Sequence, residues 1–473
     1  MIQLSKYRVL ALLFTVITFT SCKKSFLELA PPTSVYPSQA LGSEADLQVA
    51  LRGAYSALRG VDFYGRTIPL IGDIMGDNTY QHSTNTNRYT LYNNYSFNTT
   101  DGNALGIWTT GYSAILRANR IIAADLPAST VVDQIKGEAY AIRALCYFTM
   151  VRYFAKAYTD DPNALGIPIV LVYDPELKPG RSKVSEVYTL ILDDLGKAFT
   201  LMTTFSNSSQ FSKYAARGLQ AKVYLTMGDM TNAKTAALDV ITNSGFTTIT
   251  TANHAGYWSG VAVRTDKLET LFEVSSDAVG NLAFDALSYI YSQNGNYGDY
   301  VVPETFYNMF EATDVRRALY PVVQRPKPTS TSAGGPAIPT VNKYPGISGD
   351  YSDTKVLRIS EMYLIAAEAS LPGNEPDALT YVNTITTNRG ATAIASTGAQ
   401  LFEDIITERR KELAFEGDRY MDYQRLKRDI ARPTNYPSSA RNILTSNFRR
   451  ILPIPQTELD ANPTIRTEQN SGY

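Results

Sequence analysis

The chain has 473 residues, of which 44% are hydrophobic and 19% are charged, so it can bury the core of an ordinary globular protein. Its 44 basic and 45 acidic residues give a formal net charge of -1, which leaves no basic excess for binding to nucleic acid. Tyrosine is unusually common, with 32 Tyr against 18 Phe. Since a buried tyrosine hydroxyl needs a hydrogen-bond partner, the excess suggests that some rings are partly exposed.

Residues 1–21 predict an export signal. Positive charge at Lys6 and Arg8 precedes an apolar stretch over residues 9–19, which is too short to span a bilayer comfortably. Two small residues then stand before Cys22, an arrangement that resembles a bacterial lipobox. We therefore expect Cys22 to be acylated and to become the new N-terminus, with a plain secretory signal as the alternative.

Residues 22–40 predict an extended, lipidated tether, because they are proline-rich and lack a helical period. The other cysteine, Cys146, lies among apolar residues with helical spacing and predicts a small buried side chain. Because no second thiol is present to pair with it, an exported protein of this sequence has no disulfide framework.

Residues 41–473 predict a single, mainly α-helical domain, because apolar residues recur three and four positions apart. The stretch 216–241 predicts two helices joined at Gly228 and Asp229, in the manner of a tetratricopeptide unit. Residues 356–390 repeat this helix–turn–helix pattern, and residues 406–429 predict a further long amphipathic helix. We expect about four such irregular helix pairs.

Residues 256–347 break the helical pattern. Short alternating runs such as LFEVS and YIYSQ predict strands, and stretches such as RPKPTSTSAGGPAIP are rich in turn residues. We therefore expect a loop-rich, partly β insertion between the helix pairs.

The chain resembles the SusD/RagB-like outer-membrane lipoproteins of the Bacteroidetes over nearly all of its mature length. Six segments carry the resemblance and occur in the family's order: CKKSFLELAPPT, GEAYAIRALCYFTMVRYFAKAY, ARGLQAKVYLTMGD, KYPG with VLRISEMYLIAAEA, ERRKELAFEGDRYMDYQRL, and LPIPQTELDANPTIRTEQNSGY. The resemblance implies four tetratricopeptide-type helix pairs and an irregular half that binds the ligand. It also implies a surface lipoprotein without catalytic activity, which captures glycans for a SusC-type TonB-dependent channel.

A cluster of acidic residues raises the alternative of an enzyme. Glu408, Glu412 and Glu416 fall four residues apart, so on one helix they would form a stripe of like charges that needs cationic partners. Candidate partners are Arg389, Arg409, Arg419 and Arg425. A glycosidase places two carboxylates on opposite sides of a bond. Carboxylates on the same face of one helix do not, so we interpret the cluster as a structural ion-pair network.

Metal and cofactor chemistry has little support in the sequence. The two histidines, His82 and His254, lie far apart in polar stretches, and no metal-binding or nucleophile motif is present. We expect no cofactor and no catalytic residue. A structural calcium ion held by Asp, Asn and backbone oxygens stays open, because such ligands need no fixed spacing.

Two polar, aromatic tracts are the candidate ligand site. Residues 78–102 contain six Asn and four Tyr but only two full charges, and residues 287–303 have the same character. Aromatic rings stack on the C–H face of a sugar, while polar side chains bond its hydroxyls. The predicted ligand-binding residues are Asp77, Asn78, Tyr80, Arg88, Tyr89, Asn94, Tyr95, Trp258, Tyr291, Asn296 and Tyr297.

Several readings stay open beside neutral glycan capture. The cargo could be peptide, because some members of the family serve peptide uptake. The repeats could form a scaffold that binds only protein partners, and the 78–102 tract could be a polar loop that does not pack. Trp108 begins a predicted helix, so we expect it in the core and not on a sugar.

Overall fold

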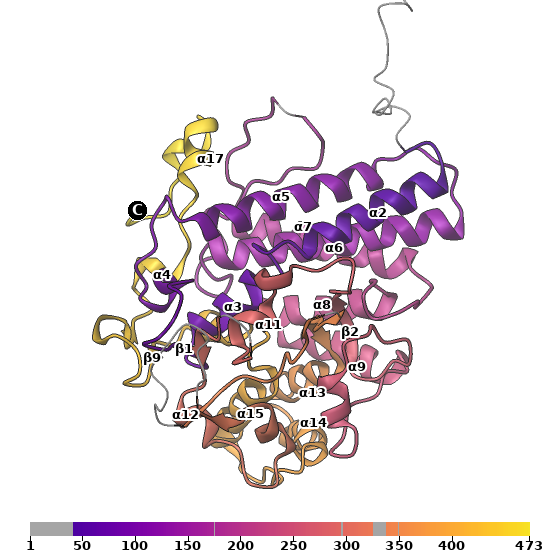
Figure 1. Ribbon diagram of the computed structural model, residues 1–473. Coiled ribbons are helices and arrows are strands. Elements are labelled where there is room, and N and C mark those ends of the chain that lie inside the picture. The colour runs from indigo at the N-terminus through magenta and orange to yellow at the C-terminus, as the bar shows by residue number, and fades with distance from the viewer. Residues whose placement is uncertain (1–40, 175, 295–296, 325–336, 349) are drawn as a thin grey trace, which may run out of the picture.

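The computed structural model describes residues 41–473 except 175, 295–296, 325–336 and 349 (Figure 1). The predicted signal, the tether and Cys22 lie outside these residues. The described part is mainly helical, as expected, and its strands form short two-stranded sheets. None of its helices is both long and apolar enough to cross a membrane.

Nine helices of ten or more residues and one of seven follow one another along the described part of the chain. Those that precede the insertion are α2 (Glu44–Leu58), α5 (Gly102–Ile122), α6 (Thr130–Phe154), α7 (Val184–Leu201), α8 (Lys213–Met227) and α9 (Met230–Asn243). Those that follow it are α13 (Ile359–Glu368), α14 (Glu375–Asn388), α15 (Gly398–Leu413) and α16 (Arg419–Arg425). Successive helices from α2 to α15 pack together, and α9 packs on α13, so the helices before and after the insertion are in contact (Figure 1).

The turn between α8 and α9 shows how the sequence sets such a pair. Gly228 has φ +79°, a left-handed conformation that a residue without Cβ adopts at no steric cost. The Asp229 side chain then caps α9 by accepting a hydrogen bond from the backbone N–H of Asn232. Ala221 and Ala233 are fully buried and permit close approach of the helices. The predicted helix pair is confirmed here.

Shorter elements make up the irregular half. The short helices are α3 (Thr67–Ile74), α4 (Thr90–Asn93), α10 (His254–Ser259), α11 (Leu287–Tyr291), α12 (Glu304–Tyr307) and α17 (Gln456–Ala461), with 3₁₀ turns at 283–285, 315–319, 438–440, 448–450 and 465–467. The antiparallel strand pairs are β1 (Tyr80–Gln81) with β3 (Tyr300–Val301), β2 (Thr270–Val274) with β8 (Thr354–Arg358), β4 (Val322–Val323) with β5 (Ile338–Pro339), β6 (Ile347–Ser348) with β7 (Asp350–Tyr351), and β9 (Ile430–Ala431) with β10 (Asn442–Ile443).

One of the two expected strands in the insertion is confirmed and the other is wrong. LFEVS lies in and beside β2, which is buried along its whole length. YIYSQ instead begins inside α11, and the backbone N–H of Ser292 donates to the carbonyl of Ser288 at 2.8 Å. Five consecutive residues of α11 are buried, so an alternating pattern of apolar residues does not describe its environment.

The acidic cluster is a buried ion-pair network, as expected. Arg389 and Arg358 approach Glu412 Oε1 at 2.8 and 2.7 Å, and Arg316 approaches its Oε2 at 3.0 Å. Burial alone would raise the pKa of Glu412, but these arginines outweigh it and hold the pKa well below its usual value. Glu408 forms an ion pair with Arg316, with 2.7 Å between its Oε1 and Arg316 Nη1. We call these residues, with Glu416 and Lys343, the glutamate network.

Two details of that expectation are wrong. Helix α15 ends at Leu413, so Glu416 reaches Arg358 from the following turn and not from the helix stripe. Among the candidate partners only Arg389 binds one of the three glutamates, while the other three pair elsewhere in the core. Their partners are Glu361 and Asp422 for Arg409, Asp77 for Arg419, and Glu368 and Asp422 for Arg425.

Candidate functional site

The two polar tracts meet in space although residues 103–286 lie between them in the sequence. Tyr80 pairs with Val301 across β1 and β3, and the backbone N–H of His82 donates to the carbonyl of Asp299 at 2.9 Å. The backbone N–H of Thr86 also donates to the Asp299 carboxylate at 2.9 Å. The 78–102 tract is therefore anchored against the insertion, and the reading of it as a loop that does not pack is wrong.

Arg88 and Tyr297 join the tracts at the surface. The Arg88 guanidinium lies 3.8 Å from the centre of the Tyr297 ring, and its Nη2 donates to the tyrosine hydroxyl at 2.9 Å. A second bond runs from Arg88 Nη1 to Thr86 Oγ1 at 2.8 Å. A guanidinium carries five N–H groups, so Arg88 has further donors for a ligand hydroxyl. Both side chains are half-buried, which holds them in place without covering them.

Further rings extend this surface. Tyr289 lies 6.3 Å from Tyr297 and 6.4 Å from Tyr351 between ring centres, and Phe284 lies 5.3 Å from Tyr289. The Phe284 side chain is 55% exposed, whereas Tyr289 and Tyr351 form the floor behind it. Burial and the neighbouring Tyr351 and Tyr297 raise the pKa of Tyr289, so its hydroxyl stays a neutral donor. These four rings are the aromatic patch.

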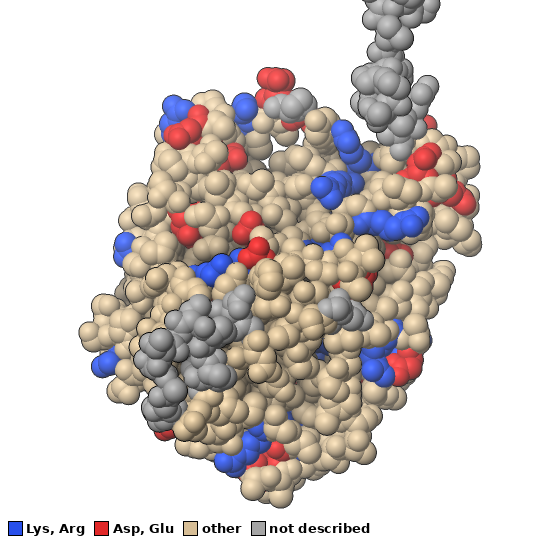
Figure 2. Space-filling model, viewed as in Figure 1, with Lys and Arg blue, Asp and Glu red and all other residues tan. Residues whose placement is uncertain are grey.

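The aromatic patch belongs to a face with few charges. Helix α11 lies near the centre of the view in Figure 1, and Figure 2 shows only scattered charged side chains over the middle of that face. Sequence reasoning missed Phe284 and Tyr351 as site residues and left Tyr289 out of the predicted set. The sequence did contain a signal for these three residues, since each lies in a short segment rich in Gly, Ser, Asn or Asp, which is typical of a surface loop.

Four of the predicted platforms are wrong as exposed rings. They are Tyr89, Tyr95, Trp258 and Tyr291, none of which exposes more than 6% of its surface. The Tyr95 hydroxyl donates to the carbonyl of Met75 at 2.7 Å, and the Tyr89 hydroxyl accepts from Arg66 Nε at 2.9 Å. Burying such large rings stabilises the fold more than exposing them would, once the hydroxyl has a partner.

Trp258 and Tyr291 belong to the packing around the glutamate network. Lys343 Nζ lies 4.3 Å from the centre of the Trp258 ring, and the Tyr257 ring packs edge-on against it. The Tyr291 ring stacks on that of Tyr344 with 6.4 Å between centres. Neither ring offers a face to a ligand in this structure.

Two predicted polar partners are also structural. Asp77 and Asn78 are buried, and they bind Arg419 and Arg410 of the helical half. Burial alone would raise the pKa of Asp77, but Arg410 and Arg419 overcome it and lower the pKa to about 2. In the structure they fasten the tract to α15 and α16, and contact with a ligand stays a prediction for both.

The remaining predicted residues keep their place as candidates. Tyr80 is half-buried with its ring 6.3 Å from that of Tyr436, and Asn94 is half-buried with its carbonyl oxygen bonded by Asn93. Arg88 and Tyr297 lie together, as described above. Asn296 lies outside the described residues. The candidate site thus consists of the aromatic patch with Arg88, and with Tyr80 and Asn94 on the same tract.

Trp108 and Cys146 lie where expected. The Trp108 side chain is 4% exposed on α5, and its Nε1–H donates to Glu458 at 3.3 Å. Cys146 is a fully buried free thiol, and burial raises its pKa. Both side chains are part of the core.

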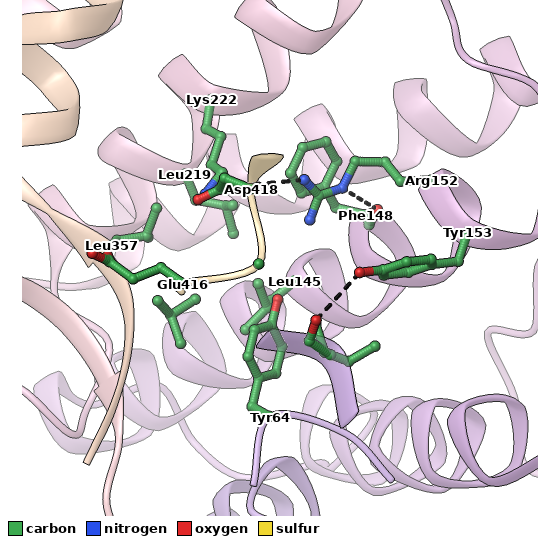
Figure 3. Close-up of a pocket in the computed structure, with 13 residues that line it drawn as sticks. Tyr64, Leu145, Phe148, Arg152, Tyr153, Leu219, Lys222, Leu357, Glu416 and Asp418 are labelled. Atoms are coloured by element: carbon green, nitrogen blue, oxygen red, sulfur yellow. Dashed lines mark hydrogen bonds and ion pairs between the residues drawn. The ribbon is translucent and has the colours of Figure 1, made fainter. Parts of the chain in front are cut away.

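A small cavity lies between α6, α8 and the turn after α15 (Figure 3). In Figure 3, Lys222 and Arg152 both approach Asp418, with Nζ 2.7 Å and Nη1 4.0 Å from its Oδ1. The cavity volume is about 20 Å³, which is room for one water molecule. That volume is too small for a sugar ring.

Metal-ligating side chains do not gather in the part of the chain that the structure describes, where no three His, Cys, Asp or Glu could hold an ion. His254 is buried on α10, and desolvation lowers its pKa to about 3, so the imidazole is neutral. A calcium site built from Asp, Asn and backbone oxygens stays a prediction.

Two family models match the chain. The first, described as "Starch-binding associating with outer membrane", covers residues 25–225, and the second, described as "SusD family", covers residues 338–473. The two matches leave residues 226–337 uncovered, and this stretch contains three of the four rings of the aromatic patch.

Relatives match over nearly the whole length. SusD-like protein P2 of Formosa agariphila is 27% identical, with 99% of this chain and 100% of the relative aligned. A SusD-like protein of Bacteroides ovatus is 25% identical over 88% of this chain and 82% of its own. Crystal structures of SusD superfamily proteins from Bacteroides thetaiotaomicron and Bacteroides vulgatus superpose with TM-scores of 0.81 and 0.82, at 28% and 27% identity. They cover 90% and 91% of this chain and 99% of each of those chains.

Proposed function

Because the chain belongs to the SusD family, whose members include starch-binding proteins associated with the outer membrane, we propose that it captures neutral oligosaccharides at the cell surface. The captured chain passes to a SusC-type TonB-dependent channel, and the protein itself performs no chemistry. The observation that carries this proposal is the aromatic patch with Arg88 on a face that has few charges.

The patch suits an extended, uncharged ligand. Phe284 offers an exposed ring for the C–H face of a sugar. Arg88 and the hydroxyl and amide side chains of the 78–102 tract can form hydrogen bonds with the hydroxyls around the sugar ring. Stacking on one ring contributes about 0.5–1.5 kcal/mol, so useful affinity requires several contacts along one chain. Longer oligosaccharides should therefore bind more tightly than single sugars, with little dependence on salt.

The binding test is calorimetry of the protein with maltoheptaose. Replacing Phe284 and Tyr297 together by Ala should weaken binding about tenfold, since two ring contacts are lost. Tyr173→Ala is the matched control, because Tyr173 is 56% exposed in a loop outside the patch. Unchanged affinity of the double variant across a panel of neutral oligosaccharides would contradict the proposed site. Binding of peptides but of no glycan would replace the glycan proposal with peptide uptake.

Anchoring is part of the same proposal. Acylation of Cys22 would hold the protein on the outer membrane, with the described domain facing outward on the tether. Cys22→Ala should abolish labelling with palmitate, because Cys146 is buried and no other cysteine is present. Labelling at the parent level would rule out Cys22 as the lipid site.

A further inference from the structure

A groove of about 670 Å³ opens between the turn after α6 and the C-terminal segment, away from the elements that form the aromatic patch. We call it the C-terminal groove. Its walls come from residues 156–165, the end of α16, and residues 445–451 and 469–471. Its volume is in the range typical of ligand pockets, so it has room for sugar rings.

The lining of this groove is unusually cationic for a neutral protein. Lys156, Arg181, Lys427 and Arg450 line it, and Asp160 is the one acidic side chain among the described lining residues. The whole chain has a net charge of -1, so the charge is a local feature and not a general field.

The two buried arginines of the groove differ from those of the glutamate network. Arg181 and Arg450 are 8% and 4% exposed, and neither guanidinium lies within 4.0 Å of a carboxylate in the described part of the chain. Arg181 bonds four backbone carbonyls and Asn470 instead. Desolvation lowers the pKa of Arg181 to about 10, although Glu468 opposes it. Burying these guanidinium groups with no carboxylate in direct contact is costly, so an anion in the groove would offset part of that cost.

Arg450 has a donor to spare. Its Nε donates to Gln424 at 2.7 Å and its Nη1 to the carbonyl of Arg428 at 2.7 Å, while its buried Nη2 has no acceptor among the described residues. Buried polar groups are nearly always paired, so such a group in the wall of a groove indicates an absent partner. A carboxylate in the groove would place a counter-charge beside this buried guanidinium.

The other groups of the groove suit a sugar. Phe448 lines the groove and is 36% exposed. The lining also includes hydroxyl and amide side chains from residues 445–447 and 469–471. Lys156 and Lys427 are exposed at the mouth, where Lys156 makes only a loose pair with Asp161 at 3.9 Å. We infer that the C-terminal groove is a second glycan site, which binds the carboxylate of a uronic acid residue in an acidic oligosaccharide.

The test uses the full chain, purified in a detergent without sugar groups, and calorimetry with tetragalacturonate. The comparison ligand is its methyl ester, which has the same rings but no charge. We expect the acid to bind at least about tenfold more tightly than the ester at low salt, and the difference to shrink as salt screens the charges. Equal binding of acid and ester would overturn the inference.

Two exposed lysines supply the variants. Lys156→Gln and Lys427→Gln should each weaken tetragalacturonate binding about threefold to fivefold, and their combination by about tenfold or more. Lys197→Gln on α7 is the matched control, since Lys197 is exposed and outside the groove. Unchanged thermal melting would show that the double variant folds. Full affinity of that variant, or equal binding of tetra-aspartate, would refute an acidic-sugar site here.

This inference stands apart from the neutral-glycan proposal. The double variant of the groove should bind maltoheptaose as the parent does, whereas the Phe284 and Tyr297 variant should bind tetragalacturonate as the parent does. Loss of both ligands in either variant would contradict two separate sites.

Discussion

The aromatic patch and the glutamate network both contain the side-chain types that bind sugars, but they differ in whether those groups already have partners. In the network, Glu412 receives hydrogen bonds from three arginines, and all of these side chains are buried. In the patch, Phe284 is 55% exposed and Arg88 retains unused donors. The richest cluster of charge is therefore part of the core, and the plainer, neutral surface is the one that can take a ligand.

Removing the central glutamate tests whether the network is structural, and it has one of the two largest expected effects. Glu412→Gln leaves Arg316, Arg358 and Arg389 buried with less counter-charge, which should lower the free energy of unfolding by about 3–5 kcal/mol. Urea unfolding measures this loss. Maltoheptaose affinity of the folded variant should equal that of the parent. A stable variant with lost binding would instead place the network in the ligand site.

A pair of ring deletions contrasts a core aromatic residue with one of the patch. Trp258 is 6% exposed and packs on Tyr257 and Lys343, so Trp258→Ala should lower stability by about 3–5 kcal/mol. Phe284→Ala removes an exposed ring and should change stability by less than about 0.5 kcal/mol. Thermal melting of the two variants checks both values. Similar losses in both would mean that the patch is part of the packed core.

The sequence predicted the helical half well because its signals are local. Apolar spacing and the turn at Gly228 depend only on neighbouring residues, and each has the expected effect in α8 and α9. The ion-pair reading of Glu412 was also accessible, since like charges on one helix face require partners. Which arginines would serve was not, because Arg316 and Arg358 come from the insertion and β8.

The ring assignments failed for the same physical reason. Tyr89 and Tyr95 satisfy their hydroxyls with Arg66 and with the Met75 carbonyl, partners that no spacing rule connects to them. Composition therefore showed that tyrosines need hydrogen bonds but not where the bonds would come from. Tyr297 lies near the surface because Arg88, in the 78–102 tract, donates a hydrogen bond to its hydroxyl there.

Two aspartates at the edge of the tract extend the comparison to pH. Burial raises the pKa of Asp73 to about 7, against the opposing bonds from Asn78 and Gly417, because no cation bonds its carboxylate. Asp77 is equally buried, but Arg410 and Arg419 lower its pKa to about 2. The first aspartate resembles an unpaired core group, and the second resembles the glutamate network.

Their contributions to stability should change in opposite directions. Folded Asp73 keeps a proton that the unfolded chain releases, so its contribution is complete below about pH 4 and falls as pH rises through about 7. Asp77 contributes above about pH 4 and loses that contribution as pH falls toward 2. Between about pH 4.5 and 7.5, Asp73→Asn should gain about 1–3 kcal/mol relative to the parent, while the cost of Asp77→Asn stays constant. Parallel trends in urea unfolding would show that the two carboxylates share one environment.

The smallest expected change in stability distinguishes two buried tyrosines, one whose hydroxyl has a hydrogen-bond partner and one whose hydroxyl has none in the described residues. Tyr95 donates to the carbonyl of Met75, whereas the Tyr291 hydroxyl is buried without a hydrogen-bond partner in the described residues. Tyr95→Phe should therefore cost about 1 kcal/mol, and Tyr291→Phe should be neutral or stabilise by about 1 kcal/mol, since it removes a buried group that is not satisfied. Both variants keep the ring, so packing is unchanged and melting temperature reports the hydroxyl alone. If Tyr291→Phe were instead as costly as Tyr95→Phe, its hydroxyl would have a partner such as a buried water, and the packing of α11 behind the aromatic patch would depend on it.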